Sequence, residues 1–118
     1  MTERAIVITT GNQVYTRDMK IVDGFMTKDL QDAVGGFFEI VQPMHLKEPY
    51  VIVCDDEGIL KRKSLNPIAS LWYGSAIVGD VVIMKEGFRD GEPDIIGLDE
   101  EEAQYIMDEA AKQVAVLA

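Results

Sequence analysis

A chain of 118 residues with 47% hydrophobic residues and only four prolines is long enough to bury a core and too apolar to be disordered. Its 21 Asp and Glu residues outnumber its 11 Lys and Arg residues, and the net charge of −10 disfavours direct binding to the phosphates of nucleic acids. No run approaches the roughly 18 apolar residues of a membrane span, no signal-peptide pattern occurs, and the single Cys54 is typical of a reducing compartment. We therefore expect one cytoplasmic domain over residues 1–118.

The first elements predicted along the chain are the two strands of a β-hairpin. Apolar residues alternate loosely over 4–10 and return over 13–17, on either side of Gly11 and Asn12, which are typical turn residues. The segment 18–25 has no clear pattern.

A short helix that ends in two glycines follows. The apolar residues of 27–34 share one helical face, and the hydroxyl of Thr27 can cap its N-terminus. Gly35 falls where the helix ends, because glycine adopts the left-handed conformation at no steric cost, and Gly36 lets the chain reverse into a strand over 37–41. The alternative, a loop that cradles a phosphate, needs glycines that open a helix, whereas this pair closes one.

The middle of the chain predicts a central strand. Residues 50–54 are nearly all apolar, an acidic turn follows at 55–58, and Ile59 begins the predicted return strand of a hairpin. The acidic turn lacks the additional spaced oxygen ligands of a calcium site, and His45 has no other metal-binding residue at ligand spacing. We expect neither a metal nor a cofactor.

A second helix is predicted between Asn66 and Gly74. Asn66 is a typical N-cap, Pro67 suits the first helical position, and Gly74 ends the helix. Asn66 can alternatively bind a ligand through its amide, and Trp72 is either a core residue or a recognition platform.

Three further segments have the apolar pattern of strands. Residues 76–78 and 81–84 form either one strand with a bulge or two strands around a turn, and 94–96 is expected to pair back on 81–85 through a turn at 89–92.

The longest helix is expected at the C-terminus, over 100–116. Asp99 and Glu102 form a capping box, and residues 99–109 contain six acidic residues and no basic one.

Four motifs stand in order along the chain: LQDAVGGFFEIV at 30–41, CDDEGIL at 54–60, LNPIASLWYG at 65–74 and IVGDVVI at 77–83. Together they resemble a family of small proteins of unknown function from bacteriophages, conjugative elements and the bacteria that carry them. The resemblance implies recurring positions at Glu39, Asn66, Ala69 and Gly79, but no activity.

The predicted fold class is α+β. We expect a mixed, mostly antiparallel sheet of five to seven short strands with three helices, the longest at the C-terminus and packed across one face of the sheet or on a partner subunit.

The sequence leaves the function open between a protein-binding and a ligand-binding role, and contains no catalytic constellation. The leading hypothesis is a non-enzymatic accessory protein of a phage or mobile element that binds a protein partner, and the acidic surface suits a basic partner. The alternative is a small-molecule-binding domain, for which a homo-oligomer remains open. The candidate ligand or partner surface comprises Gly35, Gly36, Glu39, Asn66 and Trp72. A hydrolase that uses Glu39 with Asp55 or Asp56 as paired carboxylates is least favoured, because 21 acidic residues meet that demand by chance.

Overall fold

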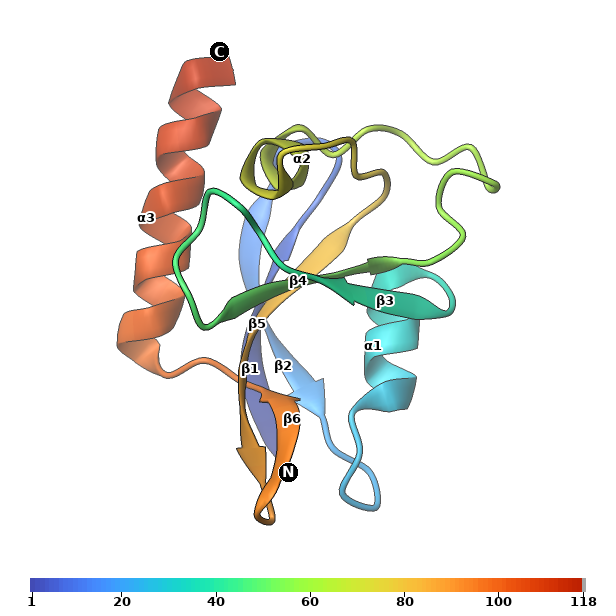
Figure 1. Ribbon diagram of the computed structural model, residues 1–118, viewed down its shortest axis with the longest axis vertical. Helices are drawn as coiled ribbons and strands as arrows, with labels where there is room; N and C mark the ends of the chain where they lie inside the picture. Colours follow the sequence, from blue (N-terminus) through green and yellow to red (C-terminus); the bar gives the residue numbers. More distant parts are fainter. Residues whose placement is uncertain (118) are drawn as a thin grey trace.

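The computed structural model describes residues 1–117, which form six strands and three helices (Figure 1). In chain order the elements are β1 (Thr2–Ile8), β2 (Val14–Lys20), α1 (Thr27–Val34), β3 (Phe38–Val41), β4 (Tyr50–Asp55), α2 (Pro67–Tyr73), β5 (Val81–Arg89), β6 (Glu92–Ile96) and α3 (Glu100–Leu117).

The strands form one antiparallel sheet in the order β2-β1-β5-β4-β3. One edge of β5 is shared by two strands: Val81–Ile83 pairs with β1, and Lys85–Arg89 pairs with β6. The predicted α+β class, with three helices and the longest at the C-terminus, is confirmed.

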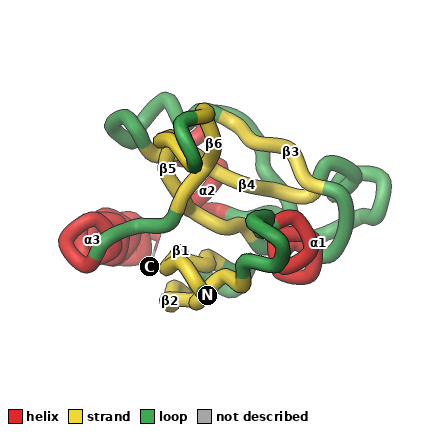
Figure 2. Tube along the Cα trace, turned by 90° about the horizontal axis from the view of Figure 1, so that it is seen from below, coloured by secondary structure: helices red, strands yellow, loops and turns green. Residues whose placement is uncertain are grey.

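Helices cover both faces of the sheet, α1 on one side and α3 on the other (Figure 2). The core on the α1 side consists of Ala5, Val7, Met19, Met26, Leu30, Val34, Val51, Val53, Val82 and Met84. The core on the side of α2 and α3 consists of Ile6, Ile8, Leu46, Tyr50, Ile52, Cys54, Ile68, Ala69, Trp72, Ile77, Val81, Ile83, Leu98, Ala103, Ile106 and Ala110. Because β1, β4 and β5 contribute alternate residues to the two cores, their sequences are apolar almost throughout.

The predicted return strand at Ile59 is wrong. Both edges of β4 are already occupied, by β3 and by β5, so a following strand has no edge on which to pair. Residues 56–62 instead form consecutive turns, and the N–H of Lys61 donates to the carbonyl of Glu57 at 3.0 Å.

The predicted register of the hairpin between β5 and β6 is also wrong. Residues 94–96 pair with 85–87, so only the Ile96–Lys85 pair falls within the predicted range 81–85. The two-residue turn at Asp90 and Gly91, both with positive φ, places Glu92 opposite Arg89 and thereby fixes the register of the whole hairpin. Residues 76–78 form no strand: Val78 makes only an isolated bridge, to Leu65, and β5 begins at Val81.

The N-terminal caps of the helices agree with the sequence in two of three cases. Asn66 caps α2 through its side chain, and Asp99 and Glu102 exchange the two hydrogen bonds of a capping box, at 2.9 and 2.8 Å. The predicted Thr27 cap is wrong: Met26 occupies the N-cap position of α1 and makes no side-chain hydrogen bond there. Among residues 1–117, no helix is both long and apolar enough to cross a membrane.

Candidate functional site

The end of α1 at Gly35 is held by two lysines from a distant loop. Gly35 has a left-handed φ of 87°, and its N–H donates to the carbonyl of Gln31. The Nζ of Lys61 donates to the Gly35 carbonyl at 3.0 Å, and the Nζ of Lys63 donates to the Val34 carbonyl at 2.6 Å. The last turn of α1 contains no basic residue of its own, so these two ammonium groups complement the negative end of the helix dipole.

Asp55 holds the same two lysines in place. Its carboxylate is inaccessible to solvent and lies 2.9 Å from Lys61 Nζ and 2.5 Å from Lys63 Nζ, while the N–H of Glu57 donates to it at 2.8 Å. Burial opposes ionisation of this carboxylate, but the hydrogen bonds from Lys63, Lys61 and the Glu57 amide outweigh it and lower the pKa of Asp55 to about 2. The basic run at 61–63 is therefore part of the scaffold, apart from the exposed Arg62.

Glu39 lies on the face of β3 that looks toward α2, the same face as Val41. Its Oε1 is 3.9 Å from the Sγ of Cys54, and both residues line a cavity of about 130 Å³ beneath the loop that carries Ile59 and Leu60. Ligand pockets usually measure about 300–1,000 Å³, so this cavity is small for a metabolite. Burial, followed by the charge and hydrogen bond of Glu39, raises the pKa of Cys54 to about 12, so the thiol stays protonated and is a poor nucleophile.

Asn66 and Trp72 lie in the interior. The Nδ2 of Asn66 donates to the carbonyls of Ile8 and Gly79 at 3.0 and 2.9 Å, and its Oδ1 accepts from the Ala69 amide at 3.1 Å. Trp72 is 1% exposed. Both side chains thus connect α2 to the sheet.

The five candidate residues are not brought together on one surface. Gly35 and Gly36 follow α1, Glu39 lines its cavity on β3, and Asn66 and Trp72 are buried under α2. A separate cleft of about 300 Å³ opens beside Gly35, but its one lysine, Lys63, is already held by Asp55.

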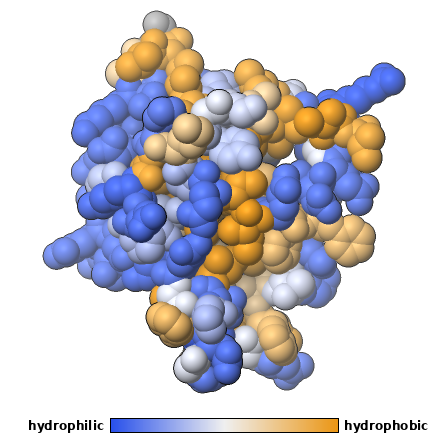
Figure 3. Space-filling model, viewed as in Figure 1, coloured by the Kyte–Doolittle hydropathy of each residue, from blue (hydrophilic) through white to orange (hydrophobic). Residues whose placement is uncertain are grey.

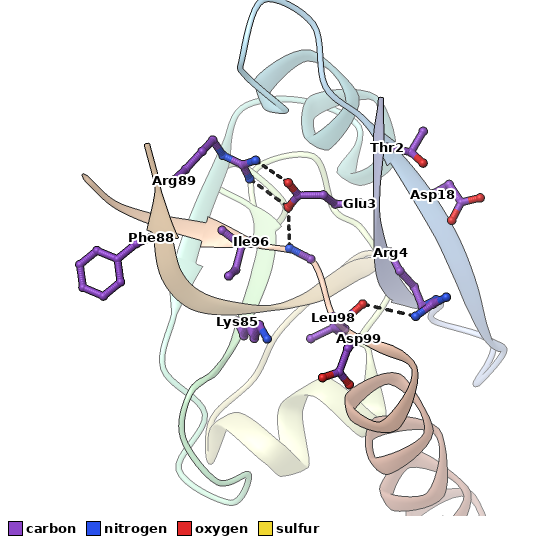
Figure 4. A pocket seen from close by; sticks show the side chains of 11 residues that line it. Thr2, Glu3, Arg4, Asp18, Lys85, Phe88, Arg89, Ile96, Leu98 and Asp99 are labelled. Carbon is purple, nitrogen blue, oxygen red and sulfur yellow. Dashed lines mark hydrogen bonds and ion pairs between the residues drawn. The ribbon is translucent and has the colours of Figure 1, made fainter. Parts of the chain in front are cut away.

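A cleft of about 500 Å³ lies between β1, β5, β6 and the start of α3 (Figure 4). One wall is a bidentate ion pair in which the guanidinium of Arg89 donates to both oxygens of Glu3, at 2.5 and 3.0 Å. The N–H of Gly97 also donates to Glu3, at 2.8 Å. The hydrogen bond from Arg89 lowers the pKa of Glu3 and raises the pKa of Arg89 itself. Sequence reasoning missed this pair, because 86 positions separate its members and no local motif connects them.

The other cations of this cleft differ in their partners. Lys85 forms an ion pair with Glu102 on α3 at 2.6 Å. Arg4 forms no ion pair with Asp or Glu in residues 1–117, and its Nη1 reaches only the Leu98 carbonyl at 3.5 Å (Figure 4). Acidic residues Asp18 and Asp99 also line the cleft, so it offers no uniformly charged surface to a ligand.

The outer side of α3 carries an acidic strip, formed by Glu100, Glu101 and Asp108. All three are exposed and lack an ion-pair partner among residues 1–117, while Ala103 and Ile106 bury the opposite side of the helix. Figure 3 shows this helix as hydrophilic along most of its length and hydrophobic at its far end.

Within the described residues, no group of three or more His, Cys, Asp and Glu side chains is arranged to hold a metal ion.

Comparison with solved structures finds the same fold in part of a larger protein. The crystal structure of the small RNA methyltransferase HEN1 aligns with a TM-score of 0.65 and 16% sequence identity, over 91% of this chain and 16% of that protein. At this identity the similarity establishes the fold alone, and this chain corresponds to only a small part of the methyltransferase. No curated protein matches the sequence.

Comparison with protein families gives a match over nearly the whole chain. Residues 1–111 match the family described as Domain of unknown function (DUF3846). The match includes all six strands and the first turns of α3, and therefore the cleft of Figure 4 and the acidic strip. The chain belongs to the DUF3846 family, a family of unknown function.

Proposed function

We propose that this chain is a non-enzymatic accessory protein of a phage or mobile element, and that it binds a protein partner with a basic surface. The observation that carries the proposal is the imbalance of its ion pairs. In residues 1–117, seven of the 11 basic side chains pair with seven of the 21 carboxylates. Fourteen carboxylates are left without a basic partner, and a basic partner would supply the missing charges.

The acidic strip on α3 is the part of this surface best suited to binding. Its three carboxylates project from a rigid helix whose other side is packed against the core, so binding needs little ordering. Glu100 and Glu101 also interact favourably with the helix dipole, which explains part of their presence, but Asp108 lies beyond the first turn and gains nothing from it.

Catalysis by paired carboxylates is disfavoured by the state of Asp55. A general acid or base must exchange protons near neutral pH, whereas Asp55 is held ionised by Lys61 and Lys63, with a pKa of about 2. The small cavity of Glu39 similarly disfavours a small-molecule ligand at that site. We propose a cytoplasmic location as well, because the one cysteine is free and buried.

The test is affinity capture from a lysate of the bacterial host, with the wild-type chain and a charge-reversal variant as baits. The variant combines Glu100→Lys, Glu101→Lys and Asp108→Lys. We expect the wild-type chain to retain a basic protein, with retention that falls as salt rises from about 50 to about 300 mM, because screening weakens exposed charge pairs.

A matched control makes the same change in charge elsewhere, through Glu48→Lys, Asp56→Lys and Glu92→Lys, all exposed. This control should retain the same protein as the wild-type chain, and the α3 variant should lose it. Equal retention by the α3 variant, or the absence of any retained protein, would refute the proposal.

A further inference from the structure

The sheet has a free edge at β3. Among residues 1–117, β3 pairs only with β4, and it is the last strand on its side of the sheet (Figure 2). Directly before the strand, the N–H of Asp56 donates to the carbonyl of Phe37 at 2.9 Å. Because hydrogen-bonded pairs alternate along an antiparallel ladder, Phe38 and Ile40 direct their backbone N–H and C=O groups away from β4. The edge therefore presents donors and acceptors that an added strand can use.

The other edge strands of the sheet, β2 and β6, are protected, whereas β3 is not. Proteins block free edges with lysine and other charged residues or with proline. The strand β2 carries Arg17 and Lys20. The strand β6 contains Pro93, which has no N–H, and Arg89 donates to the Ile95 carbonyl at 3.2 Å. The sequence of β3, FEIV, contains neither a basic residue nor a proline.

Unpaired carboxylates border the β3 edge on both faces of the sheet. Glu39 lies on the face toward α2. On the opposite face, Ile40 lines a groove of about 700 Å³ together with Phe88 and Glu86, and Ile40 and Phe88 are 45% and 71% exposed. Glu39, Asp56 and Glu86 are exposed, and none of the three forms an ion pair within residues 1–117. The two faces of the edge thus differ: a carboxylate stands at Glu39, and apolar side chains stand at Ile40 and its groove.

We propose that the edge of β3 binds an extended segment of a partner protein as an added strand, and that this segment alternates basic and apolar residues. Side chains directly opposite each other in adjacent strands lie on the same face of the sheet. The residue opposite Glu39 therefore meets its carboxylate and is Lys or Arg, while the next residue meets Ile40 and the groove and is apolar. Main-chain hydrogen bonds to Phe38 and Ile40 supply affinity, and the alternation supplies specificity.

The same charges disfavour a second copy of this chain at the edge. Pairing of β3 with β3 of another copy would bring the unpaired Glu39, Asp56 and Glu86 of both chains to one interface. The β3 edge is also separate from the acidic strip, because α3 lies at the opposite side of the molecule (Figures 1 and 2). Binding at β3 therefore goes beyond the function proposed above, and either can fail without the other.

The test is an NMR titration of the full chain with an end-capped peptide of about eight residues that alternates lysine and valine. At saturation, the amide hydrogens of Phe38 and Ile40 should exchange with solvent at least about tenfold more slowly, because the added strand accepts hydrogen bonds from them. A peptide with glutamate in place of lysine should not bind. A peptide with the same lysines and valines in two separate blocks should bind at least about tenfold more weakly, because it cannot present one residue type to each face.

Proline substitutions separate binding at this edge from general attraction to an acidic protein. Ile40→Pro removes an outward N–H that pairing with β4 does not use, and should weaken binding of the lysine peptide at least about tenfold. The matched control is Thr16→Pro on the edge strand β2. The N–H of Thr9 donates to the Gln13 carbonyl, so by the same alternation the Thr16 N–H points away from β1. This control should bind the peptide as the wild-type chain does.

Glu39→Lys tests the charge preference without changing the backbone, and it decides the outcome if Ile40→Pro does not fold. This variant should bind the glutamate peptide in preference to the lysine peptide. The proposal is overturned if the lysine peptide leaves the exchange of Phe38 and Ile40 unchanged, if the two proline variants bind it alike, or if the glutamate or the block peptide binds the wild-type chain equally well. Protection of these amides that grows with protein concentration, without peptide, would assign the edge to a second copy instead.

Discussion

Replacing Asp55 by Asn tests whether the basic run at 61–63 belongs to the scaffold. The change keeps the shape of the side chain and removes the charge that Lys61 and Lys63 share. With a pKa of about 2 in the folded chain against 3.8 ordinarily, the ionised carboxylate stabilises the fold by about 2 kcal/mol at neutral pH. The two lysines are 37% and 25% exposed and can be partly rehydrated, so we do not expect the larger loss seen when a fully buried pair is broken.

The dependence on pH follows from the sign of this shift. The folded pKa lies below the unfolded value, so the stabilisation is fully present above about pH 4 and is lost as the pH falls through about 2. The difference in free energy of unfolding between the wild-type chain and Asp55→Asn should therefore shrink from about 2 kcal/mol at neutral pH to a few tenths near pH 2. For a chain of this length, 2 kcal/mol corresponds to about 8 °C in Tm.

The assay is urea unfolding at a series of pH values, with Asp56→Asn as the control. Asp56 is the exposed neighbour of Asp55 and has no basic partner among the described residues, so its variant should stay within about 0.5 kcal/mol of the wild-type chain. The reasoning is refuted if the two variants unfold alike, or if the loss in Asp55→Asn is constant from neutral pH down to about pH 2.5.

Three further outcomes are expected. Asn66→Ala removes the cap of α2 and the hydrogen bonds that its side chain donates to two buried carbonyls, and should cost about 3 kcal/mol in urea unfolding; a loss below about 1 kcal/mol would contradict it. Arg89→Met should raise the pKa of Glu3, measured by NMR of its side-chain carboxyl carbon, because the hydrogen bond from Arg89 is what lowers it; an unchanged titration would contradict it. Cys54 should react with a thiol reagent near pH 8 only as fast as the chain unfolds, because its pKa is about 12 and it is 4% exposed; rapid labelling of the folded protein would contradict it.

Local signals in the sequence were sufficient for several features that neighbouring residues determine, although not for the Thr27 cap. The cap at Asn66, the left-handed Gly35 and the capping box of α3 depend on contacts within a few residues, and each is present as predicted. Glu39 and Val41 share one face of β3 and Phe38 lies on the other, which also follows from strand geometry alone.

Features that depend on the order of the strands could not be predicted from the sequence. A hairpin after β4 was a reasonable expectation from the turn at 55–58, but β3 and β5 occupy both edges of that strand. The same applies to the candidate site: Asn66 and Trp72 are polar or aromatic residues that recognition often uses, yet the topology places them in the core.

Ion pairs between residues far apart in the sequence could not be predicted either. Lys61 and Lys63 follow the acidic turn in the sequence, and only the fold brings them to Asp55 and the end of α1. Glu3 and Arg89 meet because β6 runs back along β5 to the N-terminal part of β1.

The proposal of a basic partner is tested most directly by the affinity for the captured protein, titrated at increasing salt with the wild-type chain and with the variant that reverses Glu100, Glu101 and Asp108. If the acidic strip makes the contact, the wild-type affinity falls steeply with salt, and the variant binds more weakly with a flatter dependence. An affinity that does not change with salt, or that is equal for the two chains, would contradict the proposal.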